Sequence, residues 1–187
     1  MLDGATPRWD ADTAVSHLFA AHWTALVRLG TLLTGDRATG EDVVQDAFVA
    51  LHRRWRRVGE PATALAYLRT SVVNGARSVA RHRAVEVKYR SPAPPAPPGP
   101  EENALRAAQD TRVMAAVRSL PQRQREVLVL RYYADLSEEQ IAVTLGISRG
   151  AVKSYAHRAM AGLRERLADD RHGADDLGGN DEGSVTS

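Results

Sequence analysis

The sequence predicts an all-α protein with two small helical domains joined by a Pro-rich linker. Apolar residues recur at helical spacing in residues 10–90 and 104–167, and neither segment shows the alternation expected of a strand. Six of the nine prolines fall in residues 91–100, between these two segments. Aromatic residues make up only 5% of the 187 residues, whereas alanine and arginine, which favour helices, are abundant.

The first domain, residues 10–90, is expected to form three helices. The first helix covers about residues 10–33, the second runs from a Thr39 cap to about Arg57, and the third spans about residues 61–89. A basic loop, RRVGEPA, joins the last two helices. The residues expected to be buried, which follow helical spacing, are Leu18, Trp23, Leu26, Leu29, Leu33, Val44, Ala47, Phe48, Leu51, Trp55, Leu65, Leu68, Val72, Val73, Ala76 and Val79.

The linker, residues 91–103, contains the run SPAPPAPPGP. Such a run favours the polyproline II conformation, at about 3.1 Å per residue, so it could reach about 40 Å. That exceeds one turn of B-DNA, about 34 to 36 Å, and would let two domains contact separate stretches of one duplex. The alternative is a ligand for a signalling module. Residues 1–9 and the acidic tail, residues 168–187, are expected to be disordered; the tail could also shield a basic face.

The second domain, residues 104–167, is expected to form four helices. Pro121 suits the first turn of the second of these, where its missing N–H is not needed. A helix-turn-helix, residues 137–163, follows. The apolar pattern of the first helix is formed by Leu105, Ala108, Val113 and Val117, and the residues expected to be buried in the second are Val127, Leu128 and Leu130.

The segment SEEQIAVTLGISRGAVKSYAHRAMAGL has the features of a DNA-binding helix-turn-helix. Ser137 and Gln140 form a capping box, and Gly146 suits the left-handed backbone of the turn. Small Ala142 allows the two helices to cross closely. The apolar residues expected to face the core are Ile141, Leu145, Ile147, Val152, Tyr155, Ala159 and Leu163. An ordinary helical hairpin with a solvated basic face is the alternative, but the agreement of caps, glycine and apolar spacing favours DNA binding.

The second helix of this motif is expected to recognise DNA with its first two turns. Ser148 can cap it, which places Arg149, Lys153 and His157 along one line. Ser154 and Arg158 flank that line. Arginine and lysine suit guanine edges or phosphates, and serine suits either, so the sequence leaves open which of these side chains contact bases.

Composition and motifs exclude several other functions. Cysteine is absent, which rules out disulfides and thiolate sites. His17 and His22 do not share a helical face, no acid completes a metal set, and no phosphate-binding glycine motif is present. We therefore expect no cofactor, no metal and no catalytic residue, so the chain is not expected to be an enzyme. No secretory signal or membrane-spanning run is recognisable, which predicts a cytoplasmic protein without membrane insertion.

The distribution of charge predicts a polyanionic partner that is contacted at two places. Five basic residues and one acid lie in residues 77–90, and the same numbers lie in residues 149–166. The formal net charge of the whole chain is only +2. Two separate basic stretches in a nearly neutral chain are typical of nucleic-acid binding.

Three segments together resemble the extracytoplasmic function (ECF) group of the sigma-70 family of RNA polymerase initiation factors. They are LTGDRATGEDVVQDAFVALHRRW, ALAYLRTSVVNGARSVARHR and LPQRQREVLVLRYYADLSEEQIAVTLGISRGAVKSYAHRAMAGLRERL. The resemblance implies a sigma region 2-like three-helix domain at residues 10–90, which contacts core polymerase and the −10 element. It also implies a sigma region 4-like four-helix domain at residues 104–167, which recognises the −35 element. An anti-sigma factor is a plausible further partner.

By this resemblance, Asp42, Gln45 and Asp46 match the polar positions of a polymerase-binding segment. Their spacing places them on one exposed helical face, although acids near a helix start are also favourable in themselves. Because Gln45 and Asp46 lie beyond the first turn, the interface is the better interpretation.

The third helix resembles the region that opens the strands and recognises the −10 element. Its matching positions are Tyr67, Asn74, Arg77, Ser78 and Arg81, and the loop at residues 57–64 corresponds to a pocket for an extruded base. Tyr67 could equally be a core residue. Since only Tyr67 and Trp55 could stack on bases there, weak intrinsic melting and a strict promoter are expected.

Two functions of other classes remain as alternatives. One is a stand-alone repressor or activator that uses only the second domain. The other is a helical adaptor that binds proteins and not DNA.

Overall fold

The computed structural model describes residues 10–89 and 104–175, and it describes side chains within residues 10–85 and 112–168. These residues form seven helices and no strand, as expected for an all-α chain. The Pro-rich linker, the N-terminal residues 1–9 and residues 176–187 lie outside the described part, as do the predictions made for them.

The first helical unit contains α1 (Ala11–Thr34), α2 (Arg37–Val58) and α3 (Pro61–Tyr89). α1 and α2 cross closely at two glycines, because a Cβ on Gly30 would lie 2.9 Å from the Gly40 carbonyl oxygen. The close packing of the two helices therefore leaves no room for a side chain at Gly30 or Gly40. Every expected core residue of this unit is buried or half-buried, with Val44, Leu51, Leu68, Val72 and Val73 fully covered.

Two boundaries in this unit differ from the sequence prediction. α2 begins at Arg37 and is capped by Asp36, not by Thr39, which instead donates its N–H and its hydroxyl to Asp36 Oδ2 at 2.7 and 2.6 Å. Aspartate and threonine both serve as caps, so the sequence allowed either. The basic loop is also shorter than expected, because only Gly59 and Glu60 separate α2 from α3.

The second helical unit contains α4 (Ala104–Ser119), α5 (Gln122–Tyr132), α6 (Glu138–Leu145) and α7 (Arg149–Asp175). α7 continues eight residues past the expected end at residue 167. Pro121 is the N-cap of α5 and precedes the first helical residue.

The apolar pattern predicted for α4 is only partly correct. Val117 is buried, but Val113 is 43% exposed. Val113 lines a groove between the two units, together with Trp23 and Tyr133. Leu105 and Ala108 lie outside the described side chains.

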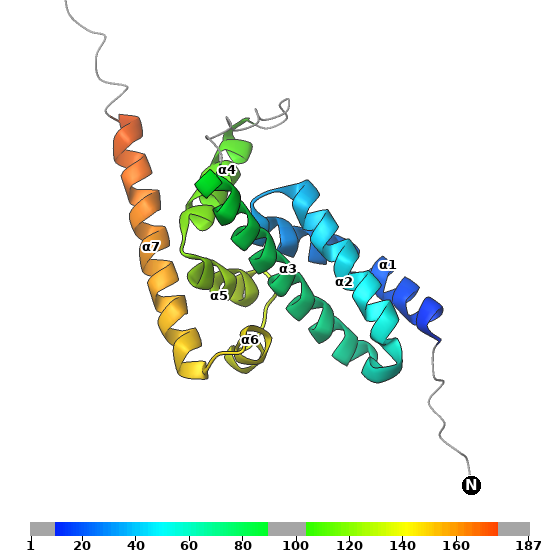
Figure 1. Ribbon diagram of the computed structural model, residues 1–187. Coiled ribbons are helices and arrows are strands. Elements are labelled where there is room, and N and C mark those ends of the chain that lie inside the picture. The colour runs from blue at the N-terminus through cyan, green and yellow to red at the C-terminus, as the bar shows by residue number, and fades with distance from the viewer. Residues whose placement is uncertain (1–9, 90–103, 176–187) are drawn as a thin grey trace, which may run out of the picture.

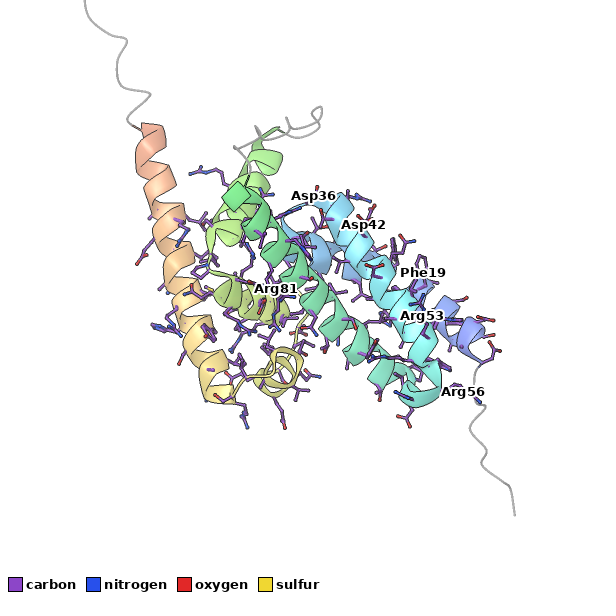
Figure 2. All side chains as sticks on the ribbon, in the orientation of Figure 1. Phe19, Asp36, Asp42, Arg53, Arg56 and Arg81 are labelled. Atoms are coloured by element: carbon purple, nitrogen blue, oxygen red, sulfur yellow. The ribbon has the colours of Figure 1, made fainter. Side chains whose placement is uncertain are left out.

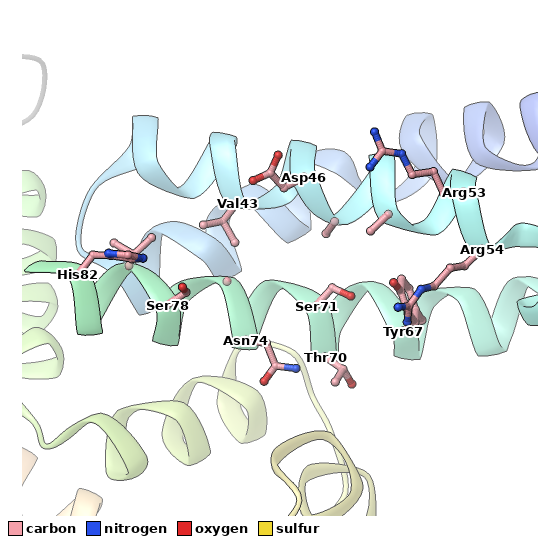
Figure 3. Close-up of a pocket in the computed structure, with 14 residues that line it drawn as sticks. Val43, Asp46, Arg53, Arg54, Tyr67, Thr70, Ser71, Asn74, Ser78 and His82 are labelled. Atoms are coloured by element: carbon pink, nitrogen blue, oxygen red, sulfur yellow. The ribbon is translucent and has the colours of Figure 1, made fainter.

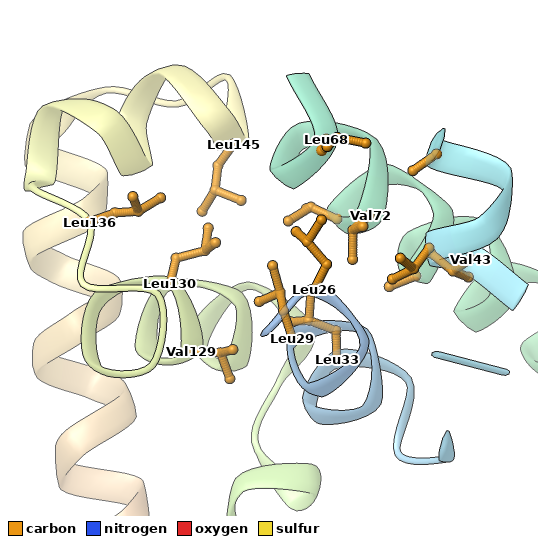
Figure 4. Packing of buried hydrophobic residues seen from close by; sticks show 14 of the residues in the cluster. Leu26, Leu29, Leu33, Val43, Leu68, Val72, Val129, Leu130, Leu136 and Leu145 are labelled. Carbon is orange, nitrogen blue, oxygen red and sulfur yellow. The ribbon is translucent and has the colours of Figure 1, made fainter. Parts of the chain in front are cut away.

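The two units pack against each other and share one apolar core. α1 contacts α4 and α5, and α3 contacts α6. Figure 4 shows Leu26 of α1 and Val72 of α3 facing Leu130 of α5 and Leu145 of α6. In Figure 1, α5 and α6 lie between α3 and α7, so α7 is on the side of the second unit that faces away from the first.

Candidate nucleic-acid interface

The turn between α6 and α7 has the geometry that the sequence predicts for a helix-turn-helix. Ser137 Oγ accepts from the Gln140 N–H at 3.2 Å, and Gln140 Oε1 accepts from the Ser137 N–H at 2.9 Å, which completes the capping box. Gly146 has a φ of 65°, in the left-handed region. The Ile147 N–H then donates to the Ala142 carbonyl at 3.0 Å, which fixes the direction of the chain as it enters α7.

The first turn of α7 is held firmly on its inner side. Ser148 Oγ accepts from the Ala151 N–H at 3.1 Å, so Ser148 caps the helix as predicted. Val152 and Ala159 are fully buried, while Tyr155 and Leu163 are half-buried. The burial of this stripe determines which side of α7 faces outward.

The outer side of α7 presents every side chain predicted to recognise DNA there. Ser148, Arg149, Lys153, Ser154, His157 and Arg158 are all exposed. Four of them line a shallow hollow of about 610 Å³: Lys153, Ser154, His157 and Arg158.

Arg158 is partly preorganised on this surface. Its guanidinium carbon lies 4.8 Å from the centroid of the Tyr155 ring, and its Nε donates to the Ser154 carbonyl at 3.2 Å. Cation–π contact of this kind contributes about 0.5 to 1 kcal/mol at an exposed site. The two contacts restrain the guanidinium on this exposed surface.

The predicted −10 residues lie on two different sides of α3. A groove of about 830 Å³ runs between α2 and α3, and Tyr67, Asn74 and Ser78 contribute to its lining (Figure 3). Arg53 and Asp46 of α2 line the same groove, so it has both cationic and acidic groups. Tyr67 is half-buried and packs against the core, which fits either interpretation of this residue.

Arg77 does not line that groove. Its side chain is only 15% exposed, and its guanidinium bonds to the carboxylate of Glu126 on α5, with a shortest distance of 2.7 Å. Asn74 extends from α3 on the same side, toward α5 and α6 (Figure 3). Arg81 is exposed. No local pattern predicts the burial of Glu126, which stands within a polar run, QRQRE, and yet is 3% exposed.

The predicted polymerase-binding residues share one outer face of α2. Asp42, Gln45 and Asp46 are exposed, while Val44, Ala47 and Phe48 are buried as expected. Figure 2 shows Asp42 and Arg53 along α2, and Arg81 on α3. Sequence reasoning missed one neighbour: Val49 is 44% exposed on the next turn, which adds an apolar group to this acidic face.

The described residues hold no group of three or more histidine, aspartate or glutamate side chains that could bind a metal ion. None of the described helices is long and apolar enough to cross a membrane.

Comparison with known proteins matches both units to one family. Residues 18–85 match "Sigma-70 region 2", and residues 110–163 match "Sigma-70, region 4". The chain is 35% identical over 144 residues to the RNA polymerase sigma-E factor of Streptomyces coelicolor, which covers 76% of this chain and 80% of that protein. It is also 35% identical over 156 residues to the ECF RNA polymerase sigma factor SigL of Mycobacterium tuberculosis, with 80% and 86% covered.

Solved structures agree with this match. CnrH in complex with the cytosolic domain of CnrY is 27% identical, with a TM-score of 0.62 and 86% of this chain and 96% of that chain covered. The sigma factor RpoE from Bartonella quintana, in complex with the anti-sigma factor NepR, is 24% identical and has the same fold, with a TM-score of 0.64 and 82% and 96% covered. With a helix-turn-helix in one unit and a three-helix region 2 fold in the other, the chain belongs to the ECF group of the sigma-70 family and directs RNA polymerase in promoter-specific transcription initiation.

Proposed function

We propose that this chain recognises the −35 element with the first turns of α7 and the −10 element with α3, while α2 binds core polymerase. The observation that supports this best is the outer side of α7. There, exposed cationic and polar side chains stand on a helix that is capped at Ser148 and anchored by fully buried Val152.

The chemistry of the α7 side chains suits the major groove. Arg149 and Lys153 can donate to guanine or to phosphate, and Ser154 can donate or accept. His157 and Arg158 continue the same surface by another turn. A capped helix start also carries a partial positive charge, which favours nearby phosphates.

The groove between α2 and α3 is the proposed site for −10 DNA. Ser78 offers a hydroxyl to base edges, and Tyr67 offers part of a ring for stacking. Asn74 lies at the edge of the groove, where its Oδ1 accepts from Arg77 at 3.3 Å. Arg53 and Arg54 on the opposite wall add positive charge for the backbone. Stacking on an aromatic side chain is worth about 1 to 3 kcal/mol per base, which would help offset unpairing.

The test of this function is reconstitution. The purified chain is added to core polymerase with a library of promoter sequences, and the transcripts are sequenced. Transcripts from a defined promoter class that depend on the added chain are expected; no transcription beyond that of core polymerase alone would rule the proposal out. A stand-alone regulator would instead bind an operator tightly without polymerase.

Salt dependence separates DNA binding from the protein adaptor. About six phosphate contacts should give a slope near −5 in a plot of log affinity against log salt concentration. A flat response would favour the adaptor.

The polymerase-binding face is tested by charge reversal. Asp42→Lys combined with Asp46→Lys should weaken binding to core polymerase, because acids on a rigid helical face are replaced by cations. Glu139→Lys, which reverses one exposed acid on α6 in the second unit, is the matched control for each single reversal, Asp42→Lys and Asp46→Lys. Equal binding by the single reversals and this control would remove this face from the polymerase interface.

The remaining assignments follow from the same proposal. The two units correspond to domains at residues 10–90 and 104–167, and the chain would act in the cytoplasm, beside its polymerase, with no catalysis of its own. An anti-sigma factor stays a prediction that rests on family resemblance.

A further inference from the structure

A buried ion pair joins the two units across their interface. Arg77 of α3 donates from Nε to Glu126 Oε1 at 2.8 Å and from a terminal nitrogen to Oε2 at 2.7 Å. Glu126 is 3% exposed and Arg77 is 15% exposed. This two-bond geometry is the strong form of an arginine–carboxylate contact, and burial shields it from salt.

The pair commits the Nε edge of the Arg77 guanidinium, the edge that would bind a phosphate with two bonds, to Glu126. The third nitrogen of Arg77 donates to Asn74 Oδ1 at 3.3 Å, so all three guanidinium nitrogens contact protein oxygens. Glu126 in turn accepts from Gln122 at 3.1 Å and from Arg123 at 3.3 Å. The second unit therefore contains a site, built around one carboxylate, that fits the guanidinium of Arg77.

Further contacts close the same interface. The Tyr133 hydroxyl donates to the Ala25 carbonyl at 3.2 Å, and burial raises the pKa of Tyr133, an effect that Arg28 partly offsets. Arg118 donates to the Gly35 carbonyl at 3.4 Å. The apolar core continues across the interface (Figure 4). Separation of the units would thus expose apolar side chains as well as two charges.

We propose that Glu126 takes the place of a DNA phosphate: in the free chain it binds Arg77 and holds the second unit closed over this side of α3. Arg77 can then contact promoter DNA only after the units separate. The DNA half of this inference rests on the proposed role of α3 in −10 recognition, whereas the closed state of the free chain does not depend on it.

Three variants separate the effect of the ion pair from general damage. Glu126→Gln and Arg77→Gln each leave one buried charge without its partner, which is strongly destabilising to the closed interface. The double variant, Arg77→Gln with Glu126→Gln, has no charged side chain at either position. Its two units should therefore stay closed, as in the parent chain. Glu139→Gln removes an exposed acid from the same unit and is the control for net charge.

The distance between the units is measured first, without DNA. Because the chain has no cysteine, Arg56→Cys on α2 and Arg164→Cys on α7 can carry spin labels for pulsed electron paramagnetic resonance. Both replaced side chains are exposed. A single short-distance population is expected for the parent chain, the Glu139→Gln control and the double variant, and a shift to longer distances for each single variant. A long-distance population in the parent chain would overturn the closed state. Unchanged short distances in both single variants, with helix content intact by circular dichroism, would show that the ion pair does not hold the units closed.

DNA binding is measured next, by fluorescence anisotropy with a labelled random-sequence single-stranded 20-nucleotide probe. Glu126→Gln should bind severalfold more tightly than the Glu139→Gln control, because it alone frees Arg77. Arg77→Gln opens the units without supplying the guanidinium, so it should show no such gain. If Glu126→Gln opens the units but gains no affinity over Glu139→Gln, the phosphate-substitute role is wrong. If the two single variants open as expected but no variant binds DNA at all, the proposed function fails while the ion pair stands.

Discussion

The ammonium of Lys153 lies 3.8 Å from Glu138 Oε2, so an acid on α6 partly neutralises a predicted DNA-contacting residue of α7. Arg131 donates to the other oxygen of Glu138 at 3.2 Å. Glu138 is 24% exposed, which keeps it close to the surface that would face DNA. Its charge both orients Lys153 and opposes the approach of a phosphate.

Removing that charge should strengthen DNA binding without changing the preferred sequence. Glu138→Gln frees Lys153 and deletes a negative charge near the backbone, so affinity should rise for specific and random duplexes alike. Because Glu138 lies in the first turn of α6, the variant should also lose about 0.3 to 1 kcal/mol of stability. Anisotropy titrations with both duplexes test this, and a gain confined to one sequence would contradict it.

Arg149 and Lys153 should contribute to sequence-specific recognition of the −35 element as well as to charge attraction. Arg149→Ala or Lys153→Ala should weaken binding to the preferred promoter by about 1 to 3 kcal/mol if the side chain contacts a base with two bonds. Arg164→Ala removes an equal charge further along α7 and is the matched control. Promoter competition assays would show altered discrimination only for the first two. If all three variants lose the same affinity, these side chains contact phosphates alone.

The crossing of α1 and α2 should not tolerate a methyl group. A Cβ on Gly40 would lie 2.7 Å from the Thr31 amide nitrogen and 3.1 Å from the Gly30 carbonyl carbon, and backbone cannot move aside easily. Gly40→Ala should therefore cost about 1 to 3 kcal/mol, the usual range for overpacking. Gly150→Ala is the control, since its Cβ would meet only Ser148 Oγ at 3.9 Å. Urea unfolding should show the control to be unchanged or slightly stabilised.

Asp36 should make the stability of the chain depend on acid pH. Hydrogen bonds from the Thr39 hydroxyl and N–H lower the pKa of Asp36 below 3.8, so its contribution is present above that value and is lost as pH falls through the lowered pKa. Asp36→Ala should cost about 0.5 to 2 kcal/mol at neutral pH, as for other N-caps.

The same cap offers its own control. Asp36→Asn keeps an acceptor for Thr39 but has no proton to gain, so it should retain most of the stability at pH 7. Urea midpoints measured for the three chains between pH 7 and pH 2 check this. The difference in urea midpoint between the parent chain and Asp36→Ala should narrow only in the acid range. A difference that stays constant with pH would show that the charge of Asp36 does not contribute to stability.

Local signals in the sequence predicted the helix-turn-helix best. The capping box at Ser137 and Gln140, the left-handed Gly146 and the buried stripe of α7 each depend on residues a few positions apart. The predicted N-cap of α2 was wrong, because Asp36 and Thr39 are both good capping residues. Only the backbone conformation shows which of the two lies at the N-cap position.

Contacts between distant residues were beyond sequence reasoning. Glu126 stands among polar neighbours and has no local reason to be buried, since its partner Arg77 lies 49 positions earlier in the chain. Val113 fits a helical pattern, but it lines the groove beside Trp23 and is 43% exposed. Spacing identifies which residues share a side of a helix, but not which neighbour covers that side.

The apolar core that runs through both units also affects how the protein melts. Two independent domains would give two transitions, whereas side chains such as Leu26 and Leu130 in one cluster couple the units thermodynamically. Calorimetry of the free chain should accordingly show a single cooperative endotherm. A destabilising substitution in either unit would then lower the melting temperature of both units together.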